Sequence, residues 1–211
     1  MSATPHRALV VIDVQNEYVT GDLPIEYPDV QTSLANIGRA MDAARAAGVP
    51  VVVVQNFAPA ESPLFARGSV GAELHAVVAS REHDHYVEKA LPSAFAGTGL
   101  AAWLAAQGID TLAVAGYMTH NCDASTVFDA THAGLAVEFL DDATGSVPYE
   151  NAAGAASAAE IHRVFGVVMH SRFAAVVSTD AWIAALEAGV PLEHDNIYAS
   201  NQRARASHVT A

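Results

Sequence analysis

Short apolar runs alternate with amphipathic segments along most of the 211-residue chain. Runs rich in β-branched residues predict buried strands, and these lie at 7–14, 50–57, 85–90, 111–117 and 136–143. Apolar positions at helical spacing predict helices, and these lie at 29–48, 97–108, from Cys122 to Gly134, and at 151–165. The segment 174–189 starts as a strand and passes into a helix at Thr179 or Asp180.

Strands that alternate with helices of this length imply right-handed βαβ crossovers. We therefore expect an α/β fold with three layers, in which a mainly parallel, Rossmann-like sheet lies between helices. No linker divides the chain, so one domain is expected over 1–190. The remaining 191–211 form a polar C-terminal tail outside the core, as a surface arm or an oligomer contact.

Composition excludes several classes of protein. The formal net charge of -13 argues against nucleic acid as a partner, because phosphate binding needs a basic face. No apolar run approaches the roughly 20 residues of a membrane span, and the N-terminus does not resemble a signal peptide. The single cysteine excludes an intramolecular disulfide and fits a reducing cytoplasm. The acidity indicates solubility, with attraction of a cationic substrate as the alternative.

Three polar residues fall at or near the carboxyl ends of predicted strands, where open parallel sheets bind ligands. Asp13 closes the run ALVVID, Lys89 closes YVEK, and Cys122 lies just past LAVAGY. Taken singly, each has an ordinary structural explanation: a turn-capping aspartate, a solvated lysine and a small buried cysteine. Together, a carboxylate, an ammonium and a thiol at one sheet edge are typical of covalent catalysis.

Each residue type has a physical role in such a site. The nucleophile is the thiolate, which a helix start at Cys122 and a nearby lysine would both favour. A carboxylate can take the thiol proton and later pass it to a leaving amine. Backbone N–H groups in the turn before Cys122 can hold the oxyanion of a tetrahedral intermediate.

Three blocks of the sequence resemble the isochorismatase-like cysteine hydrolase superfamily, which includes nicotinamidases and N-carbamoylsarcosine amidohydrolases. They are ALVVIDVQNEYVTGDLPI, YVEKALPSAF and VAGYMTHNCDASTVFDATHAGLAVEFLDDATGS, and GSVGAELH at 68–75 supports them. The resemblance implies the three-layer fold of that family and a catalytic triad of Asp13, Lys89 and Cys122. It also implies a cis peptide bond at Tyr117–Met118, with the backbone N–H groups of Met118 and Cys122 as the oxyanion hole.

One departure from the family's pattern concerns metal. Nicotinamidases carry an Asp-x-His pair after the second strand, but this chain reads VVVVQNFAPAESPLF there. We therefore predict no metal and no cofactor, and we disfavour nicotinamide as substrate. The segment HDHY at 83–86 is interpreted as a solvated polar cluster, because no further ligand group accompanies it.

Several residues beside the triad are candidates for the substrate pocket. The substrate-binding residues expected from their positions are Gln15, Asn16, Tyr18, Phe57 and Tyr117, although the aromatic ones are equally consistent with core packing. Glu17 and Asp123 flank triad members and can meet a cationic amine. For Asp123 the favoured interpretation is a first-turn acid that stabilises its helix. His162 and His170 are expected at the surface or in oligomer contacts.

The sequence thus predicts a cytoplasmic, homo-oligomeric hydrolase that acts on an amide, carbamoyl or lactam carbon–nitrogen bond of a small molecule through a Cys122 thioester. Retention of the cysteine favours this chemistry over the vinyl ether cleavage of some isochorismatases. Two alternatives stay open. One is lactam opening in a cationic antibiotic, as in the streptothricin hydrolases of this superfamily. The other is a catalytically idle protein that binds a small molecule on the same fold.

Overall fold

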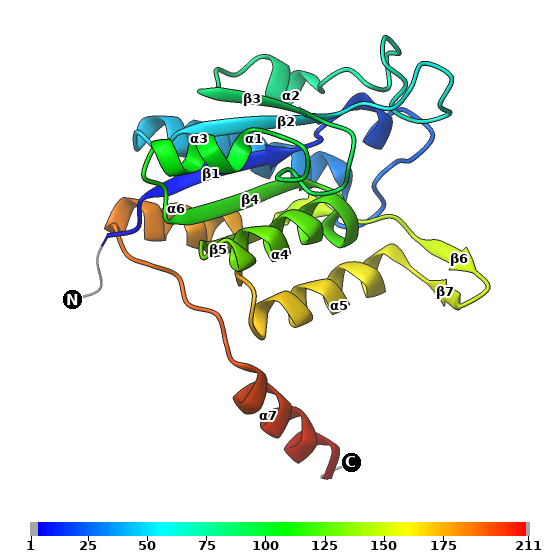
Figure 1. Cartoon of the computed structure of the whole chain (residues 1–211). Coiled ribbons are helices and arrows are strands. Elements are labelled where there is room, and N and C mark those ends of the chain that lie inside the picture. The colour runs from blue at the N-terminus through cyan, green and yellow to red at the C-terminus, as the bar shows by residue number, and fades with distance from the viewer. Residues whose placement is uncertain (1–3, 210–211) are drawn as a thin grey trace.

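A six-stranded parallel sheet forms the centre of the molecule, in the order β3-β2-β1-β4-β5-β8 (Figure 1). The computed structural model describes residues 4–209. The strands of this sheet are β1 (Arg7–Ile12), β2 (Val51–Asn56), β3 (His85–Lys89), β4 (Thr111–Tyr117), β5 (Ala136–Gly145) and β8 (Ala175–Val177). Every strand predicted from the sequence is present, within a few residues at its ends.

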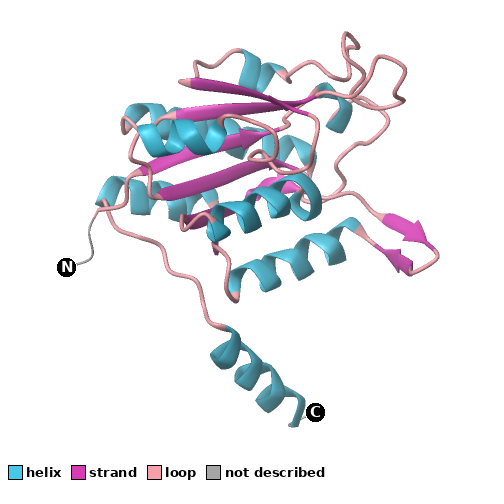
Figure 2. Cartoon of the chain, viewed as in Figure 1, coloured by secondary structure: helices cyan, strands magenta, loops and turns pink. Residues whose placement is uncertain are grey.

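Helices cover both faces of the sheet (Figure 2). One face carries α1 (Val30–Ala46), α2 (Ala76–Ala79) and α6 (Thr179–Ala188), whose buried residues share a core cluster with Leu9 and Val11 of β1. The other face carries α3 (Leu100–Ala106), α4 (Ala124–His132) and α5 (Ala158–His170), which pack with Ala8, Val10 and Ile12. Alternate residues of β1 therefore point to opposite faces of the sheet and pack into two separate hydrophobic cores. The predicted three-layer α/β architecture is confirmed.

A buried ion pair fastens the amino-terminal edge of the sheet. The Arg7 guanidinium donates from Nε and Nη2 to the two carboxylate oxygens of Glu138, each at 2.8 Å, and both side chains are 2% exposed. Trp182 Nε1 donates to the same carboxylate at 2.8 Å, and Arg7 also donates to the Val190 carbonyl at 2.6 Å. These contacts hold β1, β5 and α6 together at the amino-terminal edge of the sheet, opposite the carboxyl ends of the strands.

The predicted helix over 151–165 is wrong in its first half. Tyr149–Asn151 (β6) and Gly154–Ala156 (β7) form an antiparallel hairpin, and α5 begins only at Ala158. Gly154 has φ 132°, outside the helical region, so it breaks the alanine-rich run. Ser157 and Glu160 then form a capping box, which sets the true helix start.

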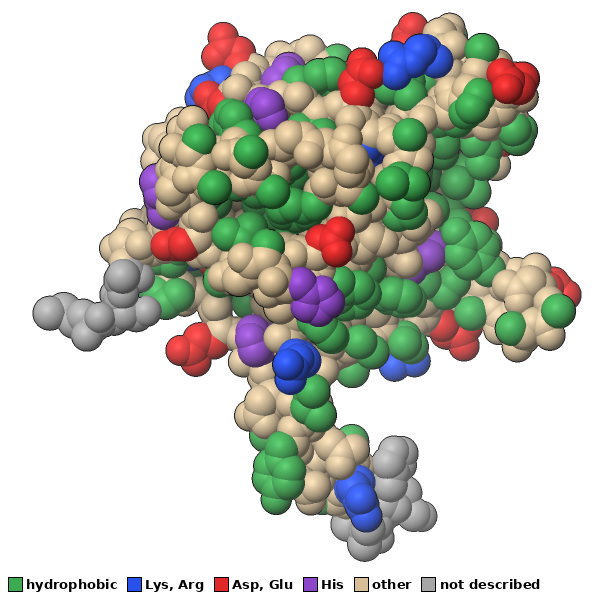
Figure 3. Space-filling view, in the orientation of Figure 1, with side chains coloured by type: hydrophobic (Ala, Val, Ile, Leu, Met, Phe, Trp, Pro, Cys, Tyr) green, Lys and Arg blue, Asp and Glu red, His purple; other side chains and the backbone are tan. Residues whose placement is uncertain are grey.

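The C-terminal residues form a further helix, α7 (Ile197–Val209), that stands away from the body of the molecule (Figures 1 and 3). The sequence indicated a polar tail outside the core but no helix there. Its exposed residues include Ile197 and Tyr198, which are 54% and 75% exposed. Within residues 4–209, none of the helices has the length and apolar character needed to cross a membrane.

Loss of Glu138 should destabilise the fold strongly. Glu138→Ala leaves the buried Arg7 charge without its partner, and we expect the free energy of unfolding to fall by about 3–5 kcal/mol. Urea denaturation followed by circular dichroism measures this. The control is Glu82→Gln, which removes the same charge from an exposed ion pair with Arg45 and should change stability little. Equal effects of the two substitutions would contradict the role assigned to the buried pair.

Candidate active site

Asp13 follows the last residue of β1 and turns its carboxylate toward the neighbouring strand ends. Its backbone is left-handed, with φ 50°, a conformation that aspartate tolerates better than most residues and that often marks functional sites. The side chain is fully buried. Gly116 of β4 passes so close that a Cβ there would lie 2.0 Å from the Ile12 carbonyl oxygen. Glycine at 116 therefore permits the close approach of β1 and β4 beside the site.

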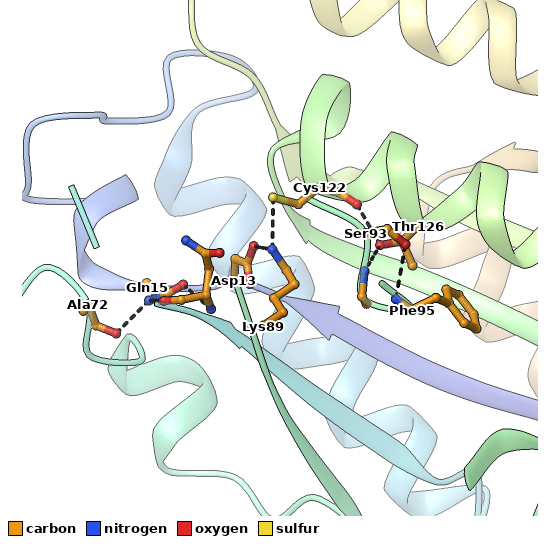
Figure 4. Close-up of polar contacts among 10 residues, drawn as sticks. Asp13, Gln15, Ala72, Lys89, Ser93, Phe95, Cys122 and Thr126 are labelled. Carbon is orange, nitrogen blue, oxygen red and sulfur yellow. Dashed lines mark hydrogen bonds and ion pairs between the residues drawn. The ribbon is translucent and has the colours of Figure 1, made fainter. Parts of the chain in front are cut away.

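Lys89, the last residue of β3, lies between the other two triad candidates (Figure 4). Its Nζ is 2.6 Å from Asp13 Oδ2 and 3.3 Å from Cys122 Sγ. The strand order places β3 two strands away from β1, so the long lysine side chain spans that distance. The structure thus brings together the carboxylate, the ammonium and the thiol that the sequence singled out.

Cys122 lies on a turn of π-helix, Thr119–Asp123, that links β4 to α4. Single π-turns of this kind occur often at functional sites. The Tyr117–Met118 peptide bond just before the turn is cis, as expected. Of the two backbone N–H groups named above for the oxyanion, that of Cys122 lies within this turn, and that of Met118 belongs to the residue that precedes it.

Thr126 connects the cysteine turn to the segment that follows Lys89, a role that sequence analysis missed. Its hydroxyl donates to the Cys122 carbonyl at 2.7 Å and accepts from the Ala94 N–H at 3.0 Å. Ser93 adds a second link by donating to Asp129 of α4 at 2.5 Å. The Ser-Ala-Phe block after the lysine thus has a mechanical role, because it holds α4 and the end of β3 in fixed relation (Figure 4).

Burial dominates the electrostatics of the three groups. It raises the pKa of the Cys122 thiol well above the ordinary value; the Asp13 carboxylate raises it further, and Lys89 lowers it. Burial also raises the pKa of Asp13 despite the attraction of Lys89. For Lys89 burial lowers the pKa, but Asp13 and Cys122 outweigh this and raise it overall. Burial and the Asp13 charge thus oppose ionisation of the thiol, whereas Lys89 favours it, as expected.

The two polar residues after Asp13 serve the loop backbone. Gln15 is fully buried; its amide donates to the carbonyls of Asn56 and Ala72, and its oxygen accepts from the Asn56 N–H. Asn16 donates to the Val70 carbonyl at 3.1 Å. These contacts fix the strand ends of β1 and β2 beside Asp13. Both N–H groups of the Gln15 side-chain amide are already donated to the backbone, so neither is available to a substrate. This argues against Gln15 as a direct substrate ligand.

The aromatic candidates divide between core and rim. Tyr18 and Tyr117 are 2% and 0% exposed, with ring centroids 5.5 Å apart, and Tyr117 shares a 2.7 Å hydrogen bond with Ser33. Phe57 is only partly buried and receives the Arg67 guanidinium 3.9 Å above its ring. Tyr117 is thus a core residue, whereas Tyr18 is close enough to Cys122 for the thiol to raise its pKa, after the larger effect of burial.

Other residues approach the site from segments that the sequence did not place there. Tyr149 on the β6–β7 hairpin is half-exposed, and its pKa is raised first by burial and then by Cys122, so the hairpin lies at the rim of the site. His162 was expected at the surface, but it is 2% exposed and contacts Thr119 Oγ1 at 2.9 Å and Asp141 at 3.0 Å. His162 thus helps to hold Thr119, the first residue of the turn that carries Cys122, in place.

The residues considered for metal binding have other contacts. Asp84 accepts from the Val51 N–H at 2.8 Å, His85 stacks on Trp103, and His83 lies against the Tyr86 ring. Among the side chains that the structure describes, no group of three or more His, Cys, Asp or Glu is arranged to hold a metal ion.

A six-stranded parallel sheet between two layers of helices, with Asp13, Lys89 and Cys122 at its carboxyl edge, makes the molecule a three-layer α/β protein with a polar site where such folds bind ligands. The isochorismatase domain model matches residues 7–181, so the chain belongs to the isochorismatase family of hydrolases. A crystal structure of an isochorismatase-type protein from Burkholderia xenovorans LB400 is 78% identical, with a TM-score of 0.97, over 98% of this chain and 100% of that one.

Curated relatives span several activities. The secreted isochorismatase effector Isc1 of Verticillium dahliae is 34% identical over 81% of this chain and 91% of its own length. The streptothricin hydrolase of Streptomyces noursei is 36% identical over 65% of this chain and 49% of its own length. An N-carbamoylsarcosine amidase from Arthrobacter is 29% identical over 61% of this chain and 55% of its own length.

Substitution of Asp13 should make the Cys122 thiol more acidic. The Asp13 charge raises the thiol pKa and Lys89 lowers it, so Asp13→Asn removes the raising contribution and leaves the lowering one. We expect alkylation of the wild type by iodoacetamide to keep accelerating above pH 9, because the thiol pKa lies above the usual value of about 8.5. The profile of Asp13→Asn should move to lower pH.

Intact-mass measurement of the alkylated fraction at each pH gives these profiles. Glu82→Gln, which removes an exposed negative charge, is the control and should match the wild type. An unshifted profile in Asp13→Asn would show that the carboxylate does not affect the thiol pKa, and a shift to higher pH would show the opposite effect; either result would contradict the prediction.

Proposed function

We propose that the protein is a cysteine hydrolase that cleaves a carbon–nitrogen bond of a small molecule, in an amide, carbamoyl or lactam group, through a Cys122 thioester. The observation that carries the proposal is the contact of one buried ammonium, Lys89, with both the Asp13 carboxylate and the Cys122 sulfur. The amidase activity named for the Arthrobacter relative supports it.

In this mechanism the thiol loses its proton only as it attacks. Asp13 takes the proton while Cys122 Sγ bonds to the carbonyl carbon, and the N–H groups of Met118 and Cys122 receive the oxyanion. Asp13 then passes the proton to the leaving nitrogen, and the thioester remains. Water attacks the thioester after losing a proton to Asp13, the acid product leaves, and the proton returns to the sulfur. Lys89 stays protonated and stabilises each anion in turn.

Removal of the nucleophile should abolish turnover and leave the fold unchanged. For Cys122→Ala we expect hydrolysis of a panel of small amides, ureido compounds and lactams to drop by about 10³-fold or more relative to the wild type. Ammonia or amine release measures turnover, and rapid quenching followed by intact-mass analysis should find the acyl group on Cys122 of the wild type.

The matched control is Ser125→Ala, a neighbouring residue of α4 outside the proposed mechanism, which should retain activity. Retained hydrolysis in Cys122→Ala would refute the mechanism. Binding of panel compounds by the wild type without any turnover would instead support the idle binding protein.

A second candidate is lactam opening in a cationic antibiotic of the streptothricin type. Two observations favour it: the 36% identity to a streptothricin hydrolase and the net charge of -13. An acidic enzyme attracts a cationic substrate over long range, so kcat/KM should fall as ionic strength rises. A kcat/KM for streptothricin that does not respond to salt would argue against this candidate.

We also propose that the enzyme is a homo-oligomer, placed in the cytoplasm, where its one thiol stays reduced. Helix α7 stands off the body with Ile197 and Tyr198 exposed, and α5 exposes Val164, Val167 and Val168 at helical spacing. The exposed valines of α5 in one copy can pack against the apolar first residues of α7 in a second copy, so that both surfaces become buried. A second copy of this chain is therefore the partner that both surfaces fit.

Polar substitution on α7 should weaken this assembly. In the full-length chain we expect the double change Ile197→Ser and Tyr198→Ser to shift the sedimentation coefficient to that of a smaller species, because it removes the exposed apolar start of α7. Ser207→Ala, at the far end of α7, is the control and should sediment as the wild type. Unchanged sedimentation of the double variant would exclude α7 from the interface.

A further inference from the structure

Asp123 is a buried carboxyl group that the mechanism above does not use. It directly follows Cys122, its side chain is 0% exposed, and neither carboxyl oxygen has a hydrogen-bond partner among the described residues. The side chain makes no capping hydrogen bond to α4. Asp123 does lie at the start of α4, as expected, but it makes no capping contact there, so its burial needs a further explanation.

The electrostatic neighbours of Asp123 place it beside the triad. Its charge raises the pKa of Cys122, Tyr18 and Tyr117, each after the larger effect of burial. Its own pKa is raised well above the ordinary range by burial and by Asp13, while Lys89 lowers it. These groups come from the ends of β1, β3 and β4 and from the short helix Asn16–Tyr18. The carboxyl group therefore belongs to the same interior space as the nucleophile.

Glu17, the other acid beside a triad residue, serves as a comparison. It is also buried, but its Oε1 accepts from the Asp22 N–H at 2.7 Å. Its carboxylate packs against Gly21 and Gly71 so closely that a Cβ at either glycine would lie within 2.4 Å of a carboxylate oxygen. The Glu17 carboxylate thus already has contacts within its own loop, whereas the two oxygens of Asp123 are available to accept hydrogen bonds.

A buried polar group without a partner costs free energy, and native structures rarely retain one without a function. The described chain supplies no donor to Asp123, so a ligand that enters the site can supply one. The Asp13–Lys89 pair already balances its own charge. An ionised Asp123 adds one negative charge to the site, which a cation beside the reacting carbonyl would balance.

We propose that Asp123 is a specificity-determining residue that binds a protonated amine, amidinium or guanidinium group of the substrate, next to the bond that Cys122 attacks. The inference rests on the proposed function and names its substrate class. When the cationic group binds, the ionised Asp123 carboxylate forms an ion pair with it, and any proton that the buried carboxyl group carried is released to solvent.

Two reagents of the same shape test this without a known substrate. 2-Chloroacetamide is neutral and 2-chloroacetamidine is cationic; each alkylates a thiol, as the carbon–sulfur bond forms, chloride leaves and the thiol proton is lost. We expect the ratio of the amidine rate to the amide rate at Cys122 to fall at least about fivefold in Asp123→Asn. Glu150→Gln, which removes a charge from the exposed rim hairpin, should keep the wild-type ratio within about twofold.

A ratio that Asp123→Asn leaves unchanged would overturn the inference and leave the proposed function intact. Failure of both reagents to label Cys122 in the wild type would overturn the proposed function, and this inference with it. If Asp123→Asn does not fold, Asp123→Ser takes its place, because it also removes the carboxyl group, and the same fall in the rate ratio is expected. An unchanged ratio in that variant would overturn the inference.

Discussion

The position of the Lys89 ammonium, between the Asp13 carboxylate and the Cys122 sulfur, is the contact on which the site depends. A buried ion pair is stable only when its geometry is good and neither partner is missing. The fold meets this requirement with backbone devices: the left-handed Asp13, the close passage of Gly116, and the Gln15 amide that joins the ends of β1 and β2. These features of the carboxyl edge of the sheet thus position the groups that contact the Lys89 ammonium.

The same burial decides how the thiol can act. A low dielectric disfavours the thiolate, and the adjacent Asp13 charge disfavours it further. The carboxylate therefore opposes ionisation of the thiol, and the Lys89 ammonium favours it. In the proposed mechanism, proton transfer to Asp13 and attack on the carbonyl occur together, and the developing oxyanion takes up the negative charge.

Much of this architecture could be predicted from the sequence, because buried parallel strands are continuous apolar runs. The pairing of Asp13, Lys89 and Cys122 needed the family resemblance, since each residue alone has a structural explanation. The failures share a physical cause. Alanine-rich 151–156 carries no strong period, so Gly154 and the Ser157 cap decided its structure. Burial of Asp123 and His162 depends on contacts between distant segments, which local patterns do not contain.

A buried carboxyl group lies near each edge of the sheet, and the two differ in their hydrogen bonds. At the amino-terminal edge, the Glu138 carboxylate has partners on both oxygens from Arg7 and Trp182. At the carboxyl edge, the Asp123 carboxyl group is equally buried and has none among the described residues. The desolvation cost is of the same kind at both edges, so burial alone does not separate structure from function. The difference lies in the hydrogen bonds: the chain itself supplies the donors to Glu138, whereas we propose that a ligand supplies those to Asp123. Cys122, the proposed nucleophile, lies directly beside Asp123.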